Sequence, residues 1–358
     1  MLLPKMNVKK ILSLAASTIK LFIIILLFTS NSRAEEKNIN YYSDDMGILS
    51  LMYHRFDENK YPSTNIQMDI FKQQIKIIKD LAYDFYDPRD LEKNFRNIKK
   101  KKKILMTIDD AFSSFYEVAW PYLKEEKIPF ILFVSTESVG KNGYMTWDQI
   151  KELEIESTVH VGNHSHAHSY LVDLKHKDFI NDIEISSSIF KEKLGYNPIF
   201  FSYPFGEYSE LIKEYISKNF KFSFGQHSGV IDNNKDPHEL PRFPINEKYG
   251  DLKRFKFLIN LNPLQYKVLY PSEKYLTNNN NPPKFLVEFF DDQKNLKNIN
   301  CFSDEGDRWE KSNINFDKKI LKINFREKFN FRRGRVNCSL NDNGIWRWFG
   351  VQFSVEQN

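Results

Sequence analysis

Short apolar runs alternate with amphipathic stretches from residue 46 to residue 224, and this alternation constrains the fold more than any other feature of the sequence. The apolar runs have the length of buried strands, and the stretches between them carry apolar residues at helical spacing. The pattern predicts strands at residues 48–53, 104–108, 130–134, 158–161, 199–203 and 221–224. It predicts helices at residues 69–81, 114–126, 147–153, 177–194 and 209–220. Strands that are joined through helices form a parallel sheet buried on both faces, so we expect an α/β fold.

Polar side chains stand where several of these strands end. His54, Asp109, Asp110 and His164 each follow or complete an apolar run, and a Pro-Phe-Gly turn comes after Tyr203. In a closed parallel barrel these strand ends share one face, which is where active sites form. An open doubly wound sheet would also bind ligands at this end, but the sequence lacks the glycine-rich turn of a dinucleotide site. A barrel with its site at the strand ends is therefore favoured.

The composition changes after residue 264, which indicates a second domain. Residues 275–283 (YLTNNNNPP) are polar and rich in Asn and Pro, as linkers are. Beyond them, the runs FLVEFF, KILKINF, GRVNCSL and IWRWFGVQFSV resemble short strands separated by Asp, Asn and Gly. We expect a first domain at residues 35–270, a linker at 271–283 and a small β-sandwich-like domain at 284–358.

Residues 1–34 resemble a secretory signal peptide. Lysines precede the apolar stretch at 21–28, and small residues precede a possible cleavage site after Ala34. The apolar stretch is shorter than the roughly 20 residues that span a membrane, so we expect cleavage, with an uncleaved anchor as the alternative. The mature chain would then be secreted, periplasmic or associated with the cell envelope.

The chain has two cysteines, Cys301 and Cys338, both in the predicted β domain. In an exported protein, two cysteines within one small domain are expected to form a disulfide. Neither cysteine lies in a C-x-x-C turn and no histidine is nearby, so this pair is not expected to bind a metal.

The charge of the chain gives little support for a nucleic-acid partner. The formal net charge is only +5 over 358 residues, and the one dense run of lysines is at residues 99–103. This run precedes an apolar strand and has no interleaved aromatic residues, so we expect a solvated loop there and no nucleic-acid binding.

Two clusters carry side chains suited to hydrolysis. Asp109 and Asp110 directly follow an apolar strand, and adjacent carboxylates repel each other unless they share a cation or a proton. Residues His164, His166 and His168 follow another strand. If the chain turns helical there, the first and third lie one turn apart on one face and can bind a metal, whereas His166 points elsewhere. The structural alternatives are a helix cap or acidic turn for the aspartates, and a surface cluster or packed core for the histidines.

With a third segment, residues 201–206 (FSYPFG), these motifs resemble the polysaccharide deacetylase family, the NodB-type domain of carbohydrate esterase family four. TIDDA is similar to T-F-D-D-G, HSHAH to H-[ST]-x-x-H, and SYPFG to R-x-P-[YF]. The segments LMYHRF, TWDQIKEL and LPRFPI also look like this family, particularly its branch near the poly-N-acetylglucosamine deacetylases. The resemblance runs from about residue 48 to residue 262.

The resemblance implies a deformed (β/α) barrel in which Asp110, His164 and His168 hold a divalent metal. Two imidazoles and one carboxylate leave positions open for water and substrate. Zinc is the expected metal, with cobalt or nickel as substitutes. Asp109 would be the general base, and the backbone N–H of Phe205 would hold the oxyanion.

The sequence departs from the family pattern at two positions of these motifs. Ala111 replaces a glycine, which affects only the backbone after the aspartate pair. Ser202 stands where many members carry an arginine, so the usual group that orients the base is missing. We expect Arg242 in LPRFPI to take that role and to reach Asp109; the alternative is that Arg242 caps the barrel or pairs with a surface carboxylate.

The family's later histidine, the general acid, has no clear match. His227 in GQHSG is the candidate, with a loop histidine as the alternative. We expect Tyr203, Pro204 and Phe205 to contact substrate, and His54 to lie at the same face.

The sequence therefore predicts a metal-dependent hydrolase that removes N-acetyl groups from a polysaccharide of the N-acetylglucosamine type and releases acetate. One alternative is an amidohydrolase of the same fold that acts on a small amide. Another is an inactive carbohydrate-binding protein, although both aspartates and both outer histidines are retained. The glycan and the oligomeric state are left open.

Overall fold

The computed structural model describes residues 47–96 and 102–357. The predicted signal peptide at 1–34 and the lysines at 99–101 lie outside the described residues. Within the described part, no helix is both long enough and apolar enough to cross a membrane.

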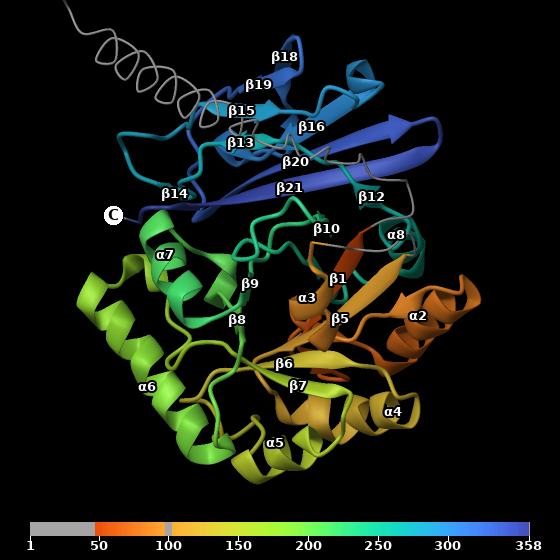
Figure 1. Ribbon diagram of the computed structural model, residues 1–358, viewed down its shortest axis with the longest axis vertical. Coiled ribbons are helices and arrows are strands. Elements are labelled where there is room, and N and C mark those ends of the chain that lie inside the picture. The colour runs from red at the N-terminus through yellow and green to blue at the C-terminus, as the bar shows by residue number, and fades with distance from the viewer. Residues whose placement is uncertain (1–46, 97–101, 358) are drawn as a thin grey trace, which may run out of the picture. The chain divides into compact units, whose positions relative to one another are not determined.

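A single sheet of nine strands forms the centre of the region from residue 47 to residue 244 (Figure 1). Its main strands run in the order β10-β1-β5-β6-β7-β8-β9, and all neighbours from β1 to β9 pair in parallel. Two short strands, β4 and β11, pair with β5 and β1. The strands are β1 (Ile48–Tyr53), β4 (Asp84–Phe85), β5 (Lys103–Asp109), β6 (Phe130–Val134), β7 (Val159–Asn163), β8 (Phe200–Ser202), β9 (Phe222–Phe224), β10 (Val230–Ile231) and β11 (Phe243–Pro244).

The chain from Leu240 to Pro244 connects the two edges of this sheet. Leu240 forms a parallel bridge with Phe224 of β9, and Phe243 pairs with Leu51 of β1. The sheet therefore curls until its first and last strands are joined through one short segment, in agreement with the predicted deformed barrel. Arg242 lies in the middle of that segment.

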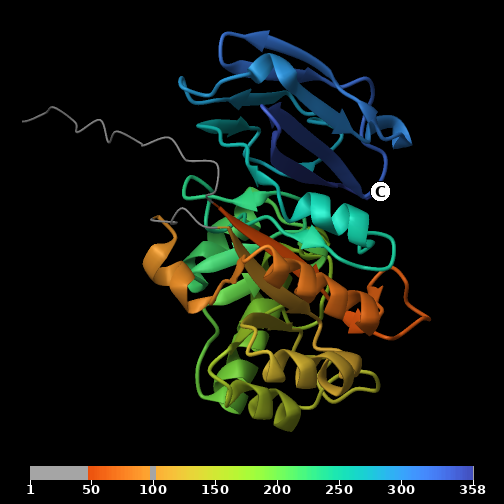
Figure 2. The same cartoon turned by 90° about the vertical axis from the view of Figure 1, so that its right-hand side faces the viewer.

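Helices flank the sheet as the sequence pattern predicts, and capping side chains set several of their ends. Thr146 and Gln149 form a reciprocal capping box at the start of α5, Ser209 caps α7, and Gly195 ends α6 with a left-handed φ of 86°. The long helices are α2 (Met68–Asp80), α5 (Trp147–Glu154), α6 (His176–Leu194) and α7 (Glu210–Asn219), and the shorter ones are α3 (Arg89–Asn94), α4 (Trp120–Glu125) and α8 (Leu252–Leu258). Figure 2 shows these helices from a second side.

The predicted helix at 114–126 is divided into two parts. Residues Phe115–Ala119 form a π-helical turn, and α4 begins at Trp120. Pro121 lies in the first turn of α4 and has no backbone N–H, so the α-helical hydrogen-bond pattern cannot pass through it unchanged.

Two further sheets form the C-terminal strand-rich region and enclose one apolar core. One has the order β12-β21-β20-β16-β17 with β14 beside β21, and the other has the order β13-β15-β19-β18. The first comprises β12 (Asn262–Pro263), β14 (Tyr275–Leu276), β16 (Ile299–Ser303), β17 (Glu310–Lys311), β20 (Arg333–Asp342) and β21 (Ile345–Val355). The second comprises β13 (Val268–Tyr270), β15 (Phe285–Glu288), β18 (Asn313–Asp317) and β19 (Ile320–Asn324). Strands thus begin at residue 262, and the expected linker at 271–283 contains β14.

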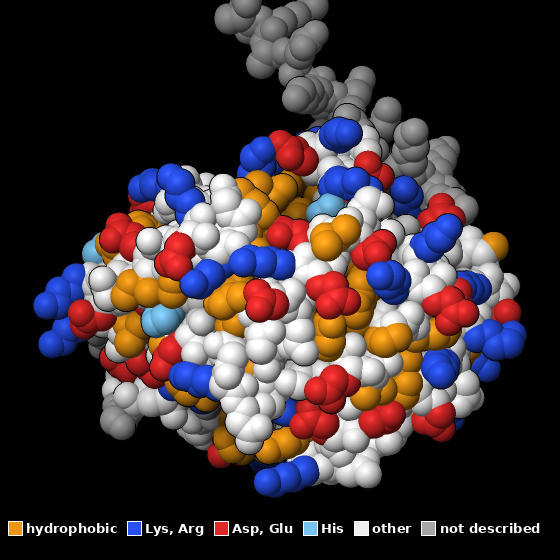
Figure 3. All heavy atoms as spheres, turned by 90° about the horizontal axis from the view of Figure 1, so that it is seen from below, with side chains coloured by type: hydrophobic (Ala, Val, Ile, Leu, Met, Phe, Trp, Pro, Cys, Tyr) orange, Lys and Arg blue, Asp and Glu red, His pale blue; other side chains and the backbone are white. Residues whose placement is uncertain are grey.

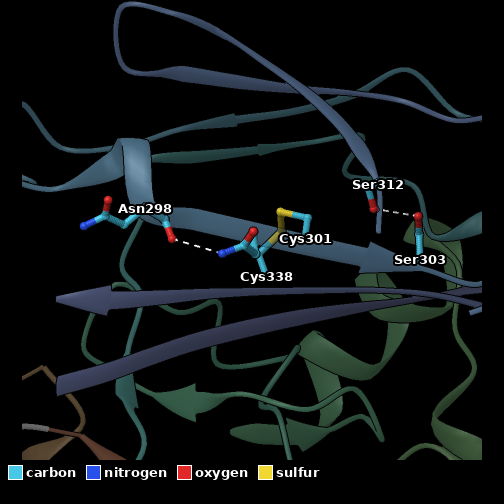
Figure 4. The surroundings of a disulfide bond; sticks show 6 residues. Asn298, Cys301, Ser303, Ser312 and Cys338 are labelled. Atoms are coloured by element: carbon cyan, nitrogen blue, oxygen red, sulfur yellow. Dashed lines mark hydrogen bonds between the residues drawn. A yellow bond between two sulfur atoms is a disulfide. The ribbon is translucent and has the colours of Figure 1, made fainter. Parts of the chain in front are cut away.

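Cys301 and Cys338 form a disulfide that joins two directly paired residues of β16 and β20 (Figure 4). Both side chains are buried in the core between the two sheets. The sequence separation is 37 residues, and by the chain-entropy model a loop of this length contributes about 4 kcal/mol to the free energy of unfolding.

The interpretation of the lysine run as a solvated loop is wrong for its last two members. Lys102 is buried and its Nζ donates to the backbone oxygen of Leu261 and to Asn262, while Lys103 lies over the ring of Tyr86. The burial of Lys102 was not visible in the sequence because its partners are about 160 residues away in the chain.

Burial lowers the pKa of Lys102 to about 7, which makes the stability of the protein depend on pH. The unfolded chain holds the proton up to a pH near 10.4, so protonation favours the unfolded state and the folded state gains stability as the pH rises from about 7. We expect wild type, measured relative to Lys102→Met, to gain about 3 kcal/mol in unfolding free energy between pH 7 and pH 9.5. Urea unfolding of both proteins at the two pH values tests this; a constant difference between them would contradict the pKa.

Candidate active site and metal centre

The aspartate pair lies where β5 ends. Asp109 is the last residue of the strand and is fully buried, and Asp110 follows it with a left-handed φ of 73°. Both carboxylates face Nε2 of His164, with Oδ2 of Asp109 at 3.8 Å and Oδ1 of Asp110 at 3.5 Å. Ala111 continues in the left-handed region at φ 53°, where glycine is favoured, so the change from the family's glycine falls on a strained residue.

His164 and His168 converge through a loop and not through a helical turn. Residues after β7 have no helical conformation until residue 171, and both Ser165 (φ 67°) and His168 (φ 51°) are left-handed. The helical interpretation of the spacing was therefore wrong, although the two rings do meet, with their centroids 4.8 Å apart. Left-handed residues bend the loop sharply enough to bring positions 164 and 168 together.

Side chains from neighbouring elements hold this loop in place. Asp182 of α6 accepts hydrogen bonds from the backbone N–H groups of His166 and Ala167, and Asn163 accepts from that of Ser165. The His166 ring turns away to Thr136, whose Oγ1 lies 2.9 Å from its Nδ1. The sequence prediction that His166 points elsewhere is therefore confirmed.

Asp110, His164 and His168 form the one cluster of this kind among the described residues that could hold a metal ion. Their ligand atoms all lie within 4.8 Å of one another, and Nε2 of His168 is 3.3 Å from Oδ1 of Asp110. Two imidazoles and a carboxylate are the donor set of hydrolytic zinc sites, so these residues fit a divalent metal.

The state of His164 suits metal binding. Its Nδ1 lies 2.7 Å from the backbone oxygen of Ser202, and an N–H at this atom leaves the lone pair of Nε2 directed at the two aspartates. Burial lowers the pKa of the His164 imidazole to about 4, so the ring is neutral at physiological pH. A neutral ring with a fixed tautomer is ready to act as a ligand.

Arg242 binds the carboxylate of Asp109 with both of its terminal nitrogens. Nη1 is 2.6 Å from Oδ1 and Nη2 is 2.9 Å from Oδ2, and both side chains are fully buried. The other donors bind Gly225 O, Thr107 Oγ1 and Ser202 Oγ, so all five N–H groups of the guanidinium have acceptors. Arg242 thus reaches Asp109 as expected from the sequence, in the bidentate geometry that fixes a carboxylate most firmly.

This ion pair determines the charge of Asp109. Burial alone would raise the pKa of the Asp109 carboxyl, but Arg242, His164 and His54 outweigh burial and lower that pKa to about 2. Asp109 is therefore ionised at physiological pH. Ser202, at the position where the family pattern has arginine, takes part as well: its Oγ accepts from Arg242 and lies 3.4 Å from Oδ2 of Asp109.

Phe205 borders the metal cluster from the turn after β8. It is left-handed, with φ 59° and ψ 4°, which is a rare conformation for a bulky residue and marks functional sites. Its ring centroid lies 4.6 Å from that of His168 and 4.0 Å from that of Tyr170, on which it stacks. Tyr170 is an aromatic neighbour of the site that the sequence analysis missed, since no motif marks it.

The substrate contacts of Tyr203 and Pro204 stay a prediction, for which the structure leaves these side chains little exposed surface. Both side chains are buried beneath the turn, and Tyr203 stacks on Tyr208 and donates its hydroxyl hydrogen to His238 O. The chain reverses at Phe205, so only the ring of Phe205 reaches the side of His168.

The structure does not support His227 as the general acid. Its side chain faces Glu239, Lys235 and Lys274, and burial lowers its pKa to about 4, so it carries no proton to donate at neutral pH. His54 directly follows β1 and is one of the residues that lower the pKa of Asp109.

Comparisons with known proteins agree with this geometry. Residues 96–222 match the model of a family described as polysaccharide deacetylase. Within residues 96–222 the chain is thus similar to polysaccharide deacetylases. It is 24% identical over 233 residues to the poly-beta-1,6-N-acetyl-D-glucosamine N-deacetylase of Staphylococcus aureus, covering 56% of this chain and 79% of that protein. It is 25% identical to the putative polysaccharide deacetylase YxkH of Bacillus subtilis, covering 45% of this chain and only 57% of YxkH.

Solved structures of deacetylases share the fold. IcaB from Ammonifex degensii superposes with a TM-score of 0.54 and 25% identity, covering 60% of this chain and 97% of IcaB. The deacetylase PplD of Streptococcus pyogenes, solved in complex with acetate, has the same TM-score with 23% identity, covering 60% of this chain and 98% of PplD. Asp109, Asp110, His164 and His168 all lie within the matched residues 96–222.

The cluster leads to a prediction for metal binding. His164→Ala, His168→Ala and Asp110→Asn should each weaken binding of Zn²⁺ or Co²⁺ by more than about 100-fold, because each alanine removes a donor atom and the asparagine replaces a charged oxygen ligand with a weaker neutral one. His166→Ala is the matched control and should bind the metal as wild type does, since His166 faces Thr136. Isothermal titration of metal-stripped protein measures the affinities. Equal weakening in His166→Ala would refute the assignment.

Proposed function

We propose that this chain is a metal-dependent deacetylase that removes N-acetyl groups from a polysaccharide of the N-acetylglucosamine type and releases acetate. The observation that carries the proposal is the buried carboxylate of Asp109, held by both arms of Arg242 beside the Asp110–His164–His168 cluster. An ionised base fixed next to a metal-binding triad is the arrangement that hydrolysis of an amide requires.

Asp109 is the general base in this proposal. Its ionised carboxylate takes a proton from the attacking water, and Oδ2 faces the cluster where that water would be held. Arg242 keeps the carboxylate charged and oriented, because a bidentate pair prevents rotation of the carboxyl group. A base with a pKa near 2 is a weak one, so its contribution depends on its orientation and on the acidity of the water beside the metal.

Asp110, His164 and His168 hold the divalent metal, for which zinc is the first candidate on the basis of the donor set. When bound, the metal supplies Lewis acidity to the amide oxygen and lowers the pKa of water. The backbone N–H of Phe205 donates to the developing oxyanion, from a turn that is already strained into position.

The substrate class follows from the named relatives that act on N-acetylated poly-glucosamine. The disulfide between Cys301 and Cys338 supports an oxidising location outside the cytosol, in agreement with the signal peptide expected at residues 1–34. On the face shown in Figure 3, acidic and basic side chains are interspersed.

The proposal is tested by the acetate released from a panel of N-acetylated polysaccharides and small N-acetyl amides. We expect release from β-1,6-linked poly-N-acetylglucosamine, loss of release with a chelator, and recovery when Zn²⁺ is added back. Asp109→Asn serves as the inactive control. Release from small amides only would favour the amidohydrolase, and binding of glycan with no release from any substrate would favour an inactive binding protein.

The base and its arginine yield a second prediction. Asp109→Asn should lower kcat by about 10²–10⁴ while metal affinity stays unchanged, because the amide cannot take the proton. Arg242→Lys should lower kcat less, since lysine keeps the charge but not the fork that binds both carboxylate oxygens. Arg242→Ala should also lower the unfolding free energy by about 3–5 kcal/mol, because it leaves a buried carboxylate unpaired. Kinetics, metal titration and urea unfolding of the three variants separate these effects. A kcat of Asp109→Asn equal to that of wild type would exclude Asp109 as the general base.

A further inference from the structure

The active-site turn at residues 203–207 is bound by side chains of the C-terminal strand-rich region. Gln352, a buried residue of β21, donates from its Nε2 to the backbone oxygen of Phe205 at 3.0 Å and to that of Gly206 at 3.2 Å. Two consecutive carbonyl groups of the turn thus share one amide donor that is contributed from about 146 residues further along the chain.

A second contact holds the residue that follows the turn. Glu207 is fully buried, and both of its carboxylate oxygens lie 3.1 Å from Nε of Arg332, directly before β20. Nη2 of the same arginine forms an ion pair with Asp173 at 2.8 Å, and its guanidinium carbon lies 3.5 Å above the ring of Tyr170. Arg332 therefore contacts three residues around the turn, Tyr170, Asp173 and Glu207, all of which lie in the region from residue 47 to residue 244.

These contacts continue to the metal cluster through aromatic rings. Tyr170, beneath Arg332, stacks on Phe205, and the ring of Phe205 meets that of His168 edge to face. Arg332 thus packs on Tyr170, Tyr170 stacks on Phe205, and Phe205 contacts His168 of the metal cluster.

The turn needs such support because its conformation is costly. A phenylalanine at φ 59° persists only where its surroundings hold it there. Below the turn, Gly206 packs so closely on Gln226 that an added Cβ would lie 2.5 Å from the Gln226 nitrogen. Above it, the two carbonyl groups are bound by Gln352. The backbone is held on both sides at the residue that presents the oxyanion donor.

We propose that Arg332 and Gln352 are positioning residues of the active site, so that the C-terminal strand-rich region completes the catalytic turn and is not an independent accessory module. The proposal rests on the proposed function of Phe205 as the oxyanion donor. Loss of either contact frees the turn to leave the left-handed conformation, and the amide of Phe205 no longer points at the reacting carbonyl. The hydrogen bond from the Phe205 N–H to the oxyanion strengthens only in the transition state. Its loss should therefore lower kcat, while KM and metal affinity change little.

The test compares Gln352→Leu and Arg332→Met with the control Asn337→Ala. Leucine keeps most of the volume of glutamine but donates no hydrogen bond. Asn337 of β20 accepts a hydrogen bond from Ser228, which lies in the region from residue 47 to residue 244. This contact also joins the C-terminal strand-rich region to that region, but it does not involve the turn at residues 203–207. We expect kcat to fall at least about tenfold in both variants, with KM and Zn²⁺ affinity within about twofold of wild type, and Asn337→Ala to resemble wild type. Arg332→Lys should recover part of kcat, because it restores a cation beside Glu207. The same variant replaces Arg332→Met in the comparison if Arg332→Met fails to fold.

Hydrogen exchange of the full-length protein supplies a measurement that does not depend on activity. Backbone amides of residues 203–209 should exchange faster in Gln352→Leu than in wild type, and at the wild-type rate in Asn337→Ala. Unchanged exchange and unchanged kcat in both turn variants would overturn the proposal, as would an equal loss of kcat in Asn337→Ala. If wild type released acetate from no substrate, the proposed function would fail, while the exchange rates would still decide whether Gln352 holds the turn.

Discussion

The buried pair of Asp109 and Arg242 is the interaction on which both the fold and the site depend. A carboxylate and a guanidinium without solvent exposure are each costly alone, and only their mutual contact and a full set of hydrogen bonds make them tolerable together. Asp109 ends the central strand β5, and Arg242 lies in the segment that joins the two edges of the curled sheet. The same contact therefore closes the barrel and holds the proposed base ionised beside the metal cluster. Stability and catalysis cannot be separated at this position.

Several residues around the same site have a strained backbone conformation. Asp110, Ala111, Ser165, His168 and Phe205 all have left-handed φ values, although none of them is glycine. Each lies in a loop that directly follows one of the strands β5, β7 or β8, so the parallel sheet supplies the rigid frame and the loops carry the strain. The frame is reinforced from outside by Asp182 of α6 and by side chains of the C-terminal region. The site is thus shaped by several elements that are far apart in the sequence.

The positions of most strands of the parallel sheet and the residues at their ends could be predicted because they leave local signals. Fully apolar runs such as that of β6 indicate buried strands, and adjacent charged or imidazole groups at strand ends are poorly explained by packing. Features that depend on contacts between segments far apart in the chain could not be predicted from the sequence. The spacing of His164 and His168 is compatible with a helical turn, because spacing alone does not reveal left-handed residues such as Ser165. Lys102 was expected in solvent and His227 at the site, since burial and the direction of a side chain are set by partners elsewhere in the chain.

The closing segment at 240–244 has a consequence for how the protein comes to its folded state. Arg242 and Asp109 are separated by 133 residues, and the chain is made from its N-terminus. Until Arg242 emerges, the carboxylate at the end of β5 has no partner and is best left hydrated, so the strands around it gain little by packing early. The barrel is therefore expected to form late and cooperatively, with topologically distant contacts limiting the folding rate. A chain built in this way would complete the surroundings of Asp109 only after residue 242 has been synthesised.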